Sequence, residues 1–341
     1  MAKVRVAVIG AGILGSRHAR VFHEHDQSET VAVVDVDETR AKTVADRHGA
    51  RAYTSLDALF GTEELDALAI ATPDHLHREP AVAALTRGKH VFLEKPLATT
   101  REDVDAIATA ARRSSAIAMV NYSQRFVPEY AAIKRIVADG TIGRPAMVTS
   151  HKFDTIHVPT AMIGWAAQTS PFFFMSSHDL DLVRWYVGQD PVEVVARDRR
   201  GVLEARGVPV HDGLNVLIAF GREVTANFHA SWIHPNSYPV VADGFLQIIG
   251  SSGMLSLDNR ARRLTLYTAK GSVEQVFSGP HTANEVAGKL VGAFTDSVTE
   301  FLAAIRAGRE PELSVVRTLP VVEAQLAAMA ALKSGAAVRV G

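Results

Sequence analysis

The stretch that decides the fold is VRVAVIGAGILG, residues 4–15 of this 341-residue chain. Its apolar half, Val4 to Ile9, is typical of a buried strand, and a helical pattern begins near Leu14. Between them lies a Gly-x-Gly-x-x-Gly turn. Gly10 permits the tight turn, Gly12 lets the backbone approach a pyrophosphate, and Gly15 lets helix and strand pack closely. The stretch therefore predicts a dinucleotide-binding loop whose contacts come from Gly10, Gly12, Ile13, Leu14 and Gly15.

An acidic residue follows at the spacing that this motif requires. Asp35 ends the next apolar run, 20 residues after Gly15. A carboxylate there accepts hydrogen bonds from both ribose hydroxyls and repels a 2′-phosphate. The sequence therefore predicts NAD as the cofactor, with NADP less favoured. Arg40 lies close enough in sequence to weaken that preference.

The first third of the chain alternates apolar runs with amphipathic segments. This alternation predicts βαβ units and a parallel sheet. The expected strands are Val4–Ile9, Thr30–Asp35, Leu65–Ala71, His90–Leu93 and Ala116–Asn121, and the expected helices are Leu14–His25, Glu38–His48, Glu79–Arg87 and Glu102–Ser114.

After about residue 122 short strand-like runs follow one another with few helices between them, which predicts a mostly antiparallel sheet. The expected strands are Ala146–Phe153, Val192–Asp198, Leu214–Phe220, Val224–Trp232, Phe245–Ile249 and Arg263–Tyr267. One helix is expected at about Ser177–Tyr186, and two more at Ala293–Ala307 and Val315–Ser334, the last between a Ser314 cap and a Gly335 stop. We therefore expect an α/β Rossmann domain over residues 1–122 and an α+β domain with a large, mostly antiparallel open sheet over residues 123–341. The C-terminal helices can pack back on the first domain.

Composition narrows the class of protein. Lys and Arg total 36 against 37 Asp and Glu, a formal net charge of -1, so no bulk field favours nucleic acid or an anionic membrane. The absence of cysteine excludes disulfides and thiolate chemistry. The first residues lack a signal-peptide cleavage pattern, and no stretch reaches the roughly 18 apolar residues of a membrane span. We expect a cytoplasmic protein.

Three further segments carry a family resemblance. They are ATPDHLH at 71–77, Glu94-Lys95-Pro96, and HDLDLVRW at 178–185. Together with the glycine loop they resemble the Gfo/Idh/MocA oxidoreductases, a family that includes inositol and sugar dehydrogenases. The resemblance covers nearly the whole chain, and the Glu-Lys-Pro motif after a strand is its most specific part.

The resemblance implies site residues at the end of the first domain's strands. Thr72, Pro73 and His75 would border the cofactor. Glu94 and Lys95 would lie beside the nicotinamide, with Lys95 contacting the reacting oxygen. The open sheet of the second domain would mediate a homodimer or a homotetramer.

The same resemblance places His178 in the active site as the usual histidine on a facing helix. An ammonium at Lys95 would stabilise a developing alkoxide, and an imidazole titrates near neutral pH, where it can take the hydroxyl proton. The alternatives are a surface lysine in a loop and a structural histidine at a helix start. This interpretation requires both groups to converge on one bound nicotinamide.

The chain departs from the family at the residue four positions before His178. The family has an aspartate there, and this chain has Phe174 within a run of three phenylalanines, 172–174. Three consequences are open. His178 would act alone or with a substrate hydroxyl, the substrate would require less assistance with proton transfer, or catalysis would be lost. The phenylalanine run predicts either a more apolar substrate pocket or core packing against the sheet.

Three more residues are candidates for substrate contact. Arg125 matches a position that often faces substrate in the family, with a salt-bridged hinge residue as the alternative. Trp165 lies on a glycine-containing loop and would cover the nicotinamide or pack on its own domain. His157 would line the same cleft or be structural. His75 and His77 lie two residues apart with no third ligand in sight, so no metal site is expected.

These patterns predict an NAD-dependent oxidoreductase that interconverts a secondary alcohol and a ketone on a sugar, cyclitol or related polyol. The alternative is a non-catalytic NAD(P)-binding regulator or sensor of the same fold, which Phe174 motivates.

Overall fold

The structure is a computed structural model that describes residues 2–276 and 284–341. The described chain divides into two compact units. The first unit comprises residues 2–126 and 284–319, and the second comprises residues 127–276 and 320–341.

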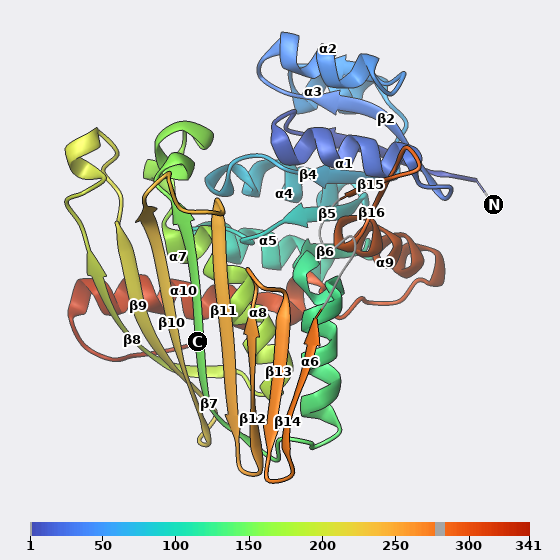
Figure 1. Cartoon of the computed structure of the whole chain (residues 1–341). Coiled ribbons are helices and arrows are strands. Elements are labelled where there is room, and N and C mark those ends of the chain that lie inside the picture. Colours follow the sequence, from blue (N-terminus) through green and yellow to red (C-terminus); the bar gives the residue numbers. More distant parts are fainter. Residues whose placement is uncertain (1, 277–283) are drawn as a thin grey trace. The chain divides into compact units, whose positions relative to one another are not determined.

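The first unit contains a six-stranded parallel sheet in the order β3-β2-β1-β4-β5-β6 (Figure 1). This order is that of a doubly wound dinucleotide-binding sheet, as the sequence predicts. Its strands are β1 (Val4–Ile9), β2 (Ser28–Val34), β3 (Arg51–Tyr53), β4 (Ala67–Ile70), β5 (His90–Glu94) and β6 (Ala118–Asn121). The sequence pattern missed β3, which has only three residues and therefore no visible alternation.

Local side-chain caps start several of the helices in this unit. Asp37, Ser55 and Thr100 each accept a hydrogen bond from a backbone N–H in the first turn of α2, α3 and α5. The helices are α1 (Ile13–Glu24), α2 (Glu38–Asp46), α3 (Leu56–Thr62), α4 (Arg78–Thr86), α5 (Arg101–Arg113) and α9 (Ala293–Ala307), and a short hairpin, β15 (Asn284–Val286) and β16 (Lys289–Val291), precedes α9. Helix α9 contacts α1, so a segment from late in the chain completes this unit.

The second unit contains a nine-stranded sheet in the order β14-β13-β12-β11-β7-β10-β9-β8-β17. Every neighbouring pair is antiparallel except β7 with β10. The mostly antiparallel sheet that the sequence predicts is therefore confirmed. The strands are β7 (Pro145–Thr155), β8 (Pro191–Arg199), β9 (Gly213–Phe220), β10 (Val224–His234), β11 (Ala242–Gly250), β12 (Gly253–Asp258), β13 (Arg263–Thr268), β14 (Gly271–Val276) and β17 (Val338–Arg339).

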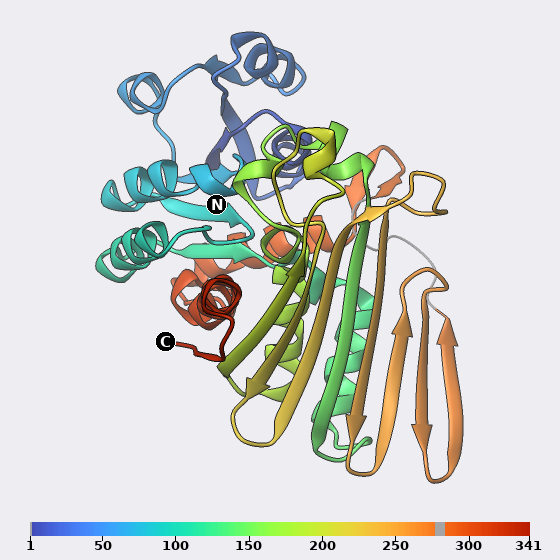
Figure 2. The same ribbon diagram turned by 90° about the vertical axis from the view of Figure 1, so that its left-hand side faces the viewer.

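One face of this sheet is covered by helices and the other is open (Figures 1 and 2). Along β7 the buried residues alternate with half-buried and exposed ones, and Met147 on the open face is 55% exposed. Helix α8 (Ser176–Val187) contacts β7 and β10, and α6 (Pro128–Ala138) packs on α8. The sequence interpretation missed α6, although a proline at its first position was an available signal.

The last helix, α10 (Val315–Ser334), has the predicted bounds. The Ser314 hydroxyl accepts from the Arg317 N–H, and Gly335 adopts a positive φ of 69° after the helix. By length and composition α10 is also apolar enough to cross a membrane, although it contains no unbroken run of roughly 18 apolar residues. Because 56% of that window is buried inside the protein, and a buried core helix passes the same test, this is weak support for a span.

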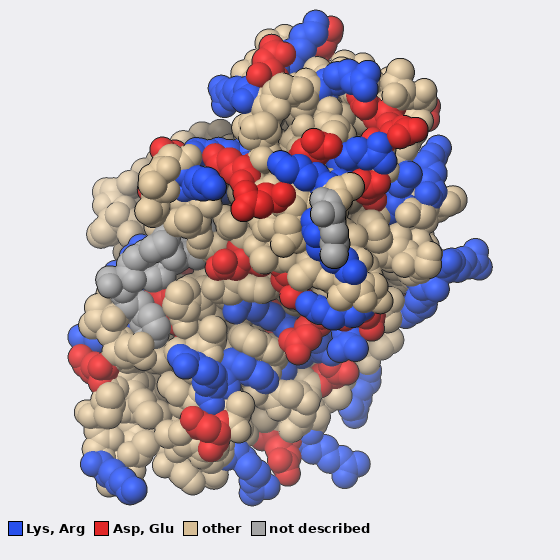
Figure 3. All heavy atoms as spheres, turned by 90° about the vertical axis from the view of Figure 1, so that its right-hand side faces the viewer, with Lys and Arg blue, Asp and Glu red and all other residues tan. Residues whose placement is uncertain are grey.

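Charged side chains of both signs are interspersed on the face drawn in Figure 3. The formal net charge of the chain is -1, and this face carries a mixture of charges rather than one continuous patch of a single sign.

Candidate active site

The glycine loop has the geometry of a phosphate-binding turn. Gly10 has a φ of 94°, and a Cβ on it would lie 2.7 Å from the Ala71 carbonyl oxygen. A Cβ on Gly15 would lie 1.6 Å from the Gly10 oxygen, so only glycine lets α1 approach β1 this closely. A Cβ on Gly12 would meet nothing within 4 Å, and Gly12 starts α1 without a side-chain cap. The N–H groups of this helix start are thus placed to receive an anionic group.

Asp35 lies directly after β2, and its carboxylate holds this loop. One oxygen accepts from the Ala11 N–H at 2.8 Å, and the other accepts from the Asp37 N–H at 2.9 Å. The Arg40 guanidinium lies 3.2 Å from the same carboxylate. Asp35 is therefore fixed beside the glycine loop, with a cation next to it that weakens its repulsion of a phosphate.

Two apolar side chains near this loop are unusually exposed. Ile13, at the start of α1, is 62% exposed, and Val36, directly after Asp35, is 90% exposed. Leu14 is half-buried. The sequence interpretation missed Val36; the available signal was an apolar residue immediately after the acidic one at a strand end. Exposed apolar groups beside a phosphate cradle are suited to contact the flat base of a nucleotide.

A histidine joins the two turns that follow β4 and β5. The ring of His77 is buried, with Nδ1 2.9 Å from the Pro96 carbonyl and Nε2 3.1 Å from the Thr72 carbonyl. It therefore ties the Thr72-Pro73 turn to the Glu-Lys-Pro turn. Because both of its nitrogens face backbone carbonyls, His77 has a structural role, whereas His75 beside it is half-buried.

Glu94, the last residue of β5, is buried and carries a compact polar network. His18 Nε2 lies 2.6 Å from Glu94 Oε1, and Asn121 donates to the same oxygen at 2.8 Å. Burial acts to raise the pKa of Glu94, but the His18 hydrogen bond, the charges of His18 and Lys95 and the Asn121 hydrogen bond outweigh it and lower the pKa. Glu94 is thus a buried carboxylate, ionised at neutral pH.

Lys95 follows directly and is half-buried, and its peptide bond to Pro96 is cis. The backbone on both sides of Lys95 is held in place. Glu94 is fixed by its polar network, Pro96 is fixed by His77, and β5 is paired with β4 and β6. The start of the Lys95 side chain is therefore fixed at the carboxyl end of the parallel sheet. In open sheets of this kind ligands bind outside that end.

Arg125 lies in η2 (Ser123–Phe126) of the first unit, and its side chain is only 8% exposed. Its guanidinium lies 3.6 Å from Glu312. This geometry gives Arg125 a counter-ion on the segment between α9 and α10.

In the second unit His178 is half-buried in the first turn of α8. The next residue, Asp179, is buried and pairs with Lys152 of β7 at 2.8 Å. Burial acts to lower the pKa of Lys152, but the charge of Asp179, its hydrogen bond and the charges of Tyr130 and Asp154 together outweigh this and raise the pKa. This ion pair anchors the helix turn that carries His178 to the sheet.

The three phenylalanines before His178 divide between two environments. Phe172 and Phe173 are buried in the core, while Phe174 is half-buried. The Phe174 ring meets the rings of Trp165 and Trp232 edge-on, at centroid distances of 5.8 and 5.7 Å. Core packing therefore explains the first two, and only Phe174 remains for a pocket.

The other candidates in this unit differ in exposure. Trp165 is half-buried against Phe174. His157 is exposed and starts η3 (Val158–Met162), and its backbone N–H donates to Asn236 at 3.0 Å.

Both parts of the chain match one family. Residues 4–122 match its oxidoreductase domain with an NAD-binding Rossmann fold, and residues 130–256 match its C-terminal domain. The chain belongs to the Gfo/Idh/MocA family.

Individual relatives agree with this assignment. An inositol 2-dehydrogenase from Acidothermus cellulolyticus is 32% identical over 74% of this chain and 72% of its own length. An inositol 2-dehydrogenase from Rhizobium meliloti is 27% identical over 90% of each chain. An Agrobacterium radiobacter oxidoreductase crystallised with NAD+, L-tartaric acid and magnesium has the same fold, with a TM-score of 0.87 at 20% identity over 100% of this chain and 99% of its own.

Family membership makes the first unit an NAD-binding domain of an oxidoreductase. Within that unit the glycine loop, Asp35, the Thr72 turn and Lys95 all lie at the carboxyl ends of neighbouring strands β1, β2, β4 and β5. Within the second unit the half-buried rings of Trp165 and Phe174 contact each other, and His178, four residues after Phe174, is half-buried as well. Among the described residues no cluster of three or more His, Asp or Glu side chains has the arrangement of a metal site.

Proposed function

We propose that this Gfo/Idh/MocA protein is an NAD-dependent dehydrogenase that interconverts a secondary alcohol and a ketone on a sugar, cyclitol or related polyol. The observation that carries the proposal is the position of Lys95. Lys95 is half-buried, and both of its neighbours in the chain are fixed: Glu94 by a buried polar network and Pro96 by His77. It follows β5, which lies two strands away from β1, the strand that leads into the glycine loop. The names of the inositol 2-dehydrogenase relatives support the class of substrate.

The glycine loop fits the proposed cofactor because a Cβ on Gly12 would enter open space at the start of α1. The N–H groups there would hold the pyrophosphate, and Asp35 would accept from the ribose hydroxyls and favour NAD over NADP. Ile13, Leu14, Thr72, Pro73, His75 and Glu94 complete the proposed cofactor-binding set. When bound, the nicotinamide supplies the hydride acceptor.

The chain's own groups would then manage the charge and the proton of the carbinol. The Lys95 ammonium would stabilise the oxygen as it becomes an alkoxide. His178 would take the hydroxyl proton, and Arg125, Trp165 and His157 would orient the substrate. The mechanism requires Lys95 and His178 to act on the same carbinol.

We further propose that residues 1–122 bind the cofactor and that residues 123–341 bind substrate and build a homodimer or homotetramer. The proposed location is the cytoplasm, with neither nucleic acid nor a membrane as a partner.

The test is a panel of polyols and keto-sugars, assayed with NAD and NADP and, in reverse, NADH and NADPH through absorbance of the reduced cofactor. Turnover of at least one compound, lost in Lys95→Ala and retained in the exposed control Lys333→Ala, is the expected result. Tight NAD binding without turnover on any compound would instead identify the non-catalytic sensor, which membership in an oxidoreductase family does not favour.

A further inference from the structure

The segment before α8 leaves two side chains partly exposed. Between residues 171 and 183 every residue is buried except Phe174 and His178. Residues four apart lie on the same side of a helical segment. Short helix α7 (Pro171–Phe174) runs into α8 through Met175, which has helical backbone angles. Phe174 and the candidate base are thus the two partly exposed positions of this segment, about one helical turn apart.

Phe174 is part of a cluster of three aromatic rings. Its ring contacts Trp165, which is half-buried, and Trp232, which is fully buried. The indole N–H of Trp232 donates to the buried Asp154 at 3.3 Å. Trp232 thus acts as a fixed support, and Trp165 and Phe174 are the two rings of the cluster that keep part of their surface exposed.

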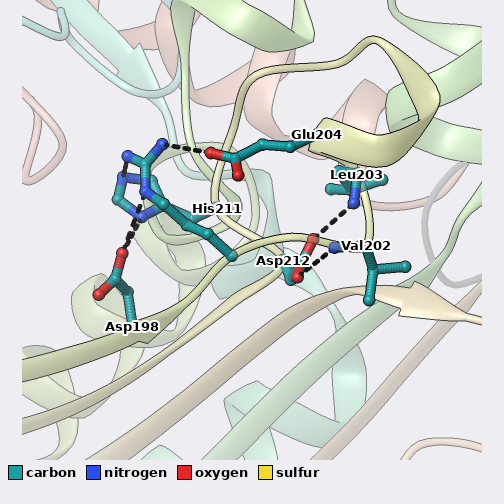
Figure 4. A network of polar contacts seen from close by, with 7 residues as sticks. Asp198, Val202, Leu203, Glu204, His211 and Asp212 are labelled. Carbon is teal, nitrogen blue, oxygen red and sulfur yellow. Dashed lines mark hydrogen bonds and ion pairs between the residues drawn. The ribbon is translucent and has the colours of Figure 1, made fainter.

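A loop between β8 and β9 backs this cluster. Leu203 and Val210 of the loop are buried in the same apolar cluster as Trp232. Asp212 accepts from the N–H groups of Val202 at 2.9 Å and Leu203 at 2.8 Å (Figure 4). His211 pairs with Asp198 at 2.7 Å at the base of the loop (Figure 4). Because these contacts hold the loop, the apolar cluster that supports the two rings is built before any ligand binds, which lowers the entropic cost of binding.

The exposed surface of these rings favours one kind of ligand face. Aromatic faces carry negative quadrupole charge and attract the weakly positive hydrogens of C–H bonds. A hydroxyl group pressed against the rings would lose water without gaining a hydrogen bond. No carboxylate is present at Phe174 to bind such a hydroxyl.

We propose that Trp165 and Phe174 form a stacking platform beside His178 that selects cyclic polyols with a C–H face free of axial hydroxyl groups. The proposal rests on the dehydrogenase function proposed above. It assigns substrate selection to two rings that belong to one unit.

Two cyclitols test the platform directly, because they differ only in the orientation of their hydroxyls. All six hydroxyls of scyllo-inositol are equatorial, so both ring faces carry only C–H bonds. D-chiro-inositol carries one axial hydroxyl on each face. Titration calorimetry on the NADH-loaded protein is expected to give a Kd for scyllo-inositol about three- to ten-fold lower than for D-chiro-inositol.

Variants locate the source of that preference. Trp165→Ala and Phe174→Leu are expected to reduce the ratio of the two Kd values to below about two, mainly by weakening scyllo-inositol binding. Trp165→Phe keeps an aromatic ring and should retain most of the ratio. Trp185→Phe is the matched control, since Trp185 packs on Tyr186 and Lys134, outside the cluster. Near-UV circular dichroism checks folding, and if Trp165→Ala unfolds, Phe174→Leu and Trp165→Phe decide.

The platform proposal is wrong if the wild type binds both cyclitols with equal affinity or binds neither of them. It is also wrong if Trp165→Ala weakens the binding of both cyclitols equally. The polyol panel keeps the two proposals apart. Turnover of polyols by a protein that does not discriminate between the cyclitols rejects only the platform. Absence of turnover on the whole panel rejects the dehydrogenase itself.

Discussion

The two units use the same device to hold their candidate catalytic side chains. In the first, Lys95 directly follows Glu94, which is buried and paired with His18 and Asn121. In the second, His178 directly precedes Asp179, which is buried and paired with Lys152. A buried charged group with a partner resists displacement, so the adjacent residue starts from a fixed backbone position.

The surroundings of the two reactive groups differ. Lys95 lies in the Glu-Lys-Pro motif, next to a buried carboxylate with polar partners. Four residues before His178 the chain has an aromatic ring, packed on two tryptophans, where the family resemblance predicts a carboxylate. The comparison separates two tasks: the anchor next in sequence sets the position of a reactive group, and its neighbours in space set what it can bind.

The largest expected effect tests whether the two anchored groups share one substrate. Lys95→Ala and His178→Ala are each expected to lower kcat/KM about 10²- to 10⁴-fold. If both act on one carbinol, the double variant should be little worse than the more damaging single variant, because groups that work as a unit are not additive. Steady-state kinetics on the best substrate of the panel measures this. Losses that multiply would show that the two groups act independently.

The anchor in the second unit should be the more costly one to break. Lys152→Met leaves Asp179 buried without its partner and is expected to lower the free energy of unfolding by about 3–5 kcal/mol. Urea denaturation followed by circular dichroism measures the change. The matched double variant, Lys152→Met with Asp179→Leu, should recover most of the loss. A single variant as stable as the wild type would contradict the role of this pair.

The charge of Glu94, the buried anchor in the first unit, should make the free energy of unfolding depend on pH. Glu94→Gln is expected to cost about 2–3 kcal/mol at neutral pH, because hydrogen bonds to a charged group are lost. The pKa of Glu94 is lowered by folding, so the stability it contributes is present above the ordinary glutamate pKa of about 4.3 and is lost as the pH falls through the lower folded value. The difference in unfolding free energy between wild type and variant should therefore shrink below about pH 4. A difference that stays constant down to acid pH would mean that the carboxylate charge is not involved.

The smallest expected effect concerns the departure from the family. Phe174→Asp introduces the residue type that the family resemblance predicts, but it places a charge against two indoles. We expect a loss of roughly 2 kcal/mol in unfolding free energy, about half the cost of removing a fully buried phenylalanine, and no gain in kcat. Thermal unfolding and the polyol assay measure both. An increase in kcat would show instead that the missing carboxylate limits the rate and that the site has not been rebuilt around the ring.

Much of the first unit could be predicted from the sequence because its signals are local. The glycine turn, the alternation of strands with helices and the ends of α9 depend on residues a few positions apart. The Glu-Lys-Pro and His178 motifs were recognisable for the same reason. Short elements such as β3, with too few residues to show a period, were missed.

Only the tertiary structure decided which distant residues meet. His18 and Glu94 are 76 positions apart, and His77 reaches Pro96 across 19. The sequence alone could not tell that Phe172 and Phe173 fill the core while Phe174 joins Trp165 and Trp232. A local pattern records the backbone preference and the buried face of each element, whereas contacts between elements depend on how all the buried faces pack together. The cofactor loop could therefore be identified from the twelve consecutive residues 4–15, whereas the surroundings of the candidate base, His178, depend on how the helices and the sheet of the second unit pack together.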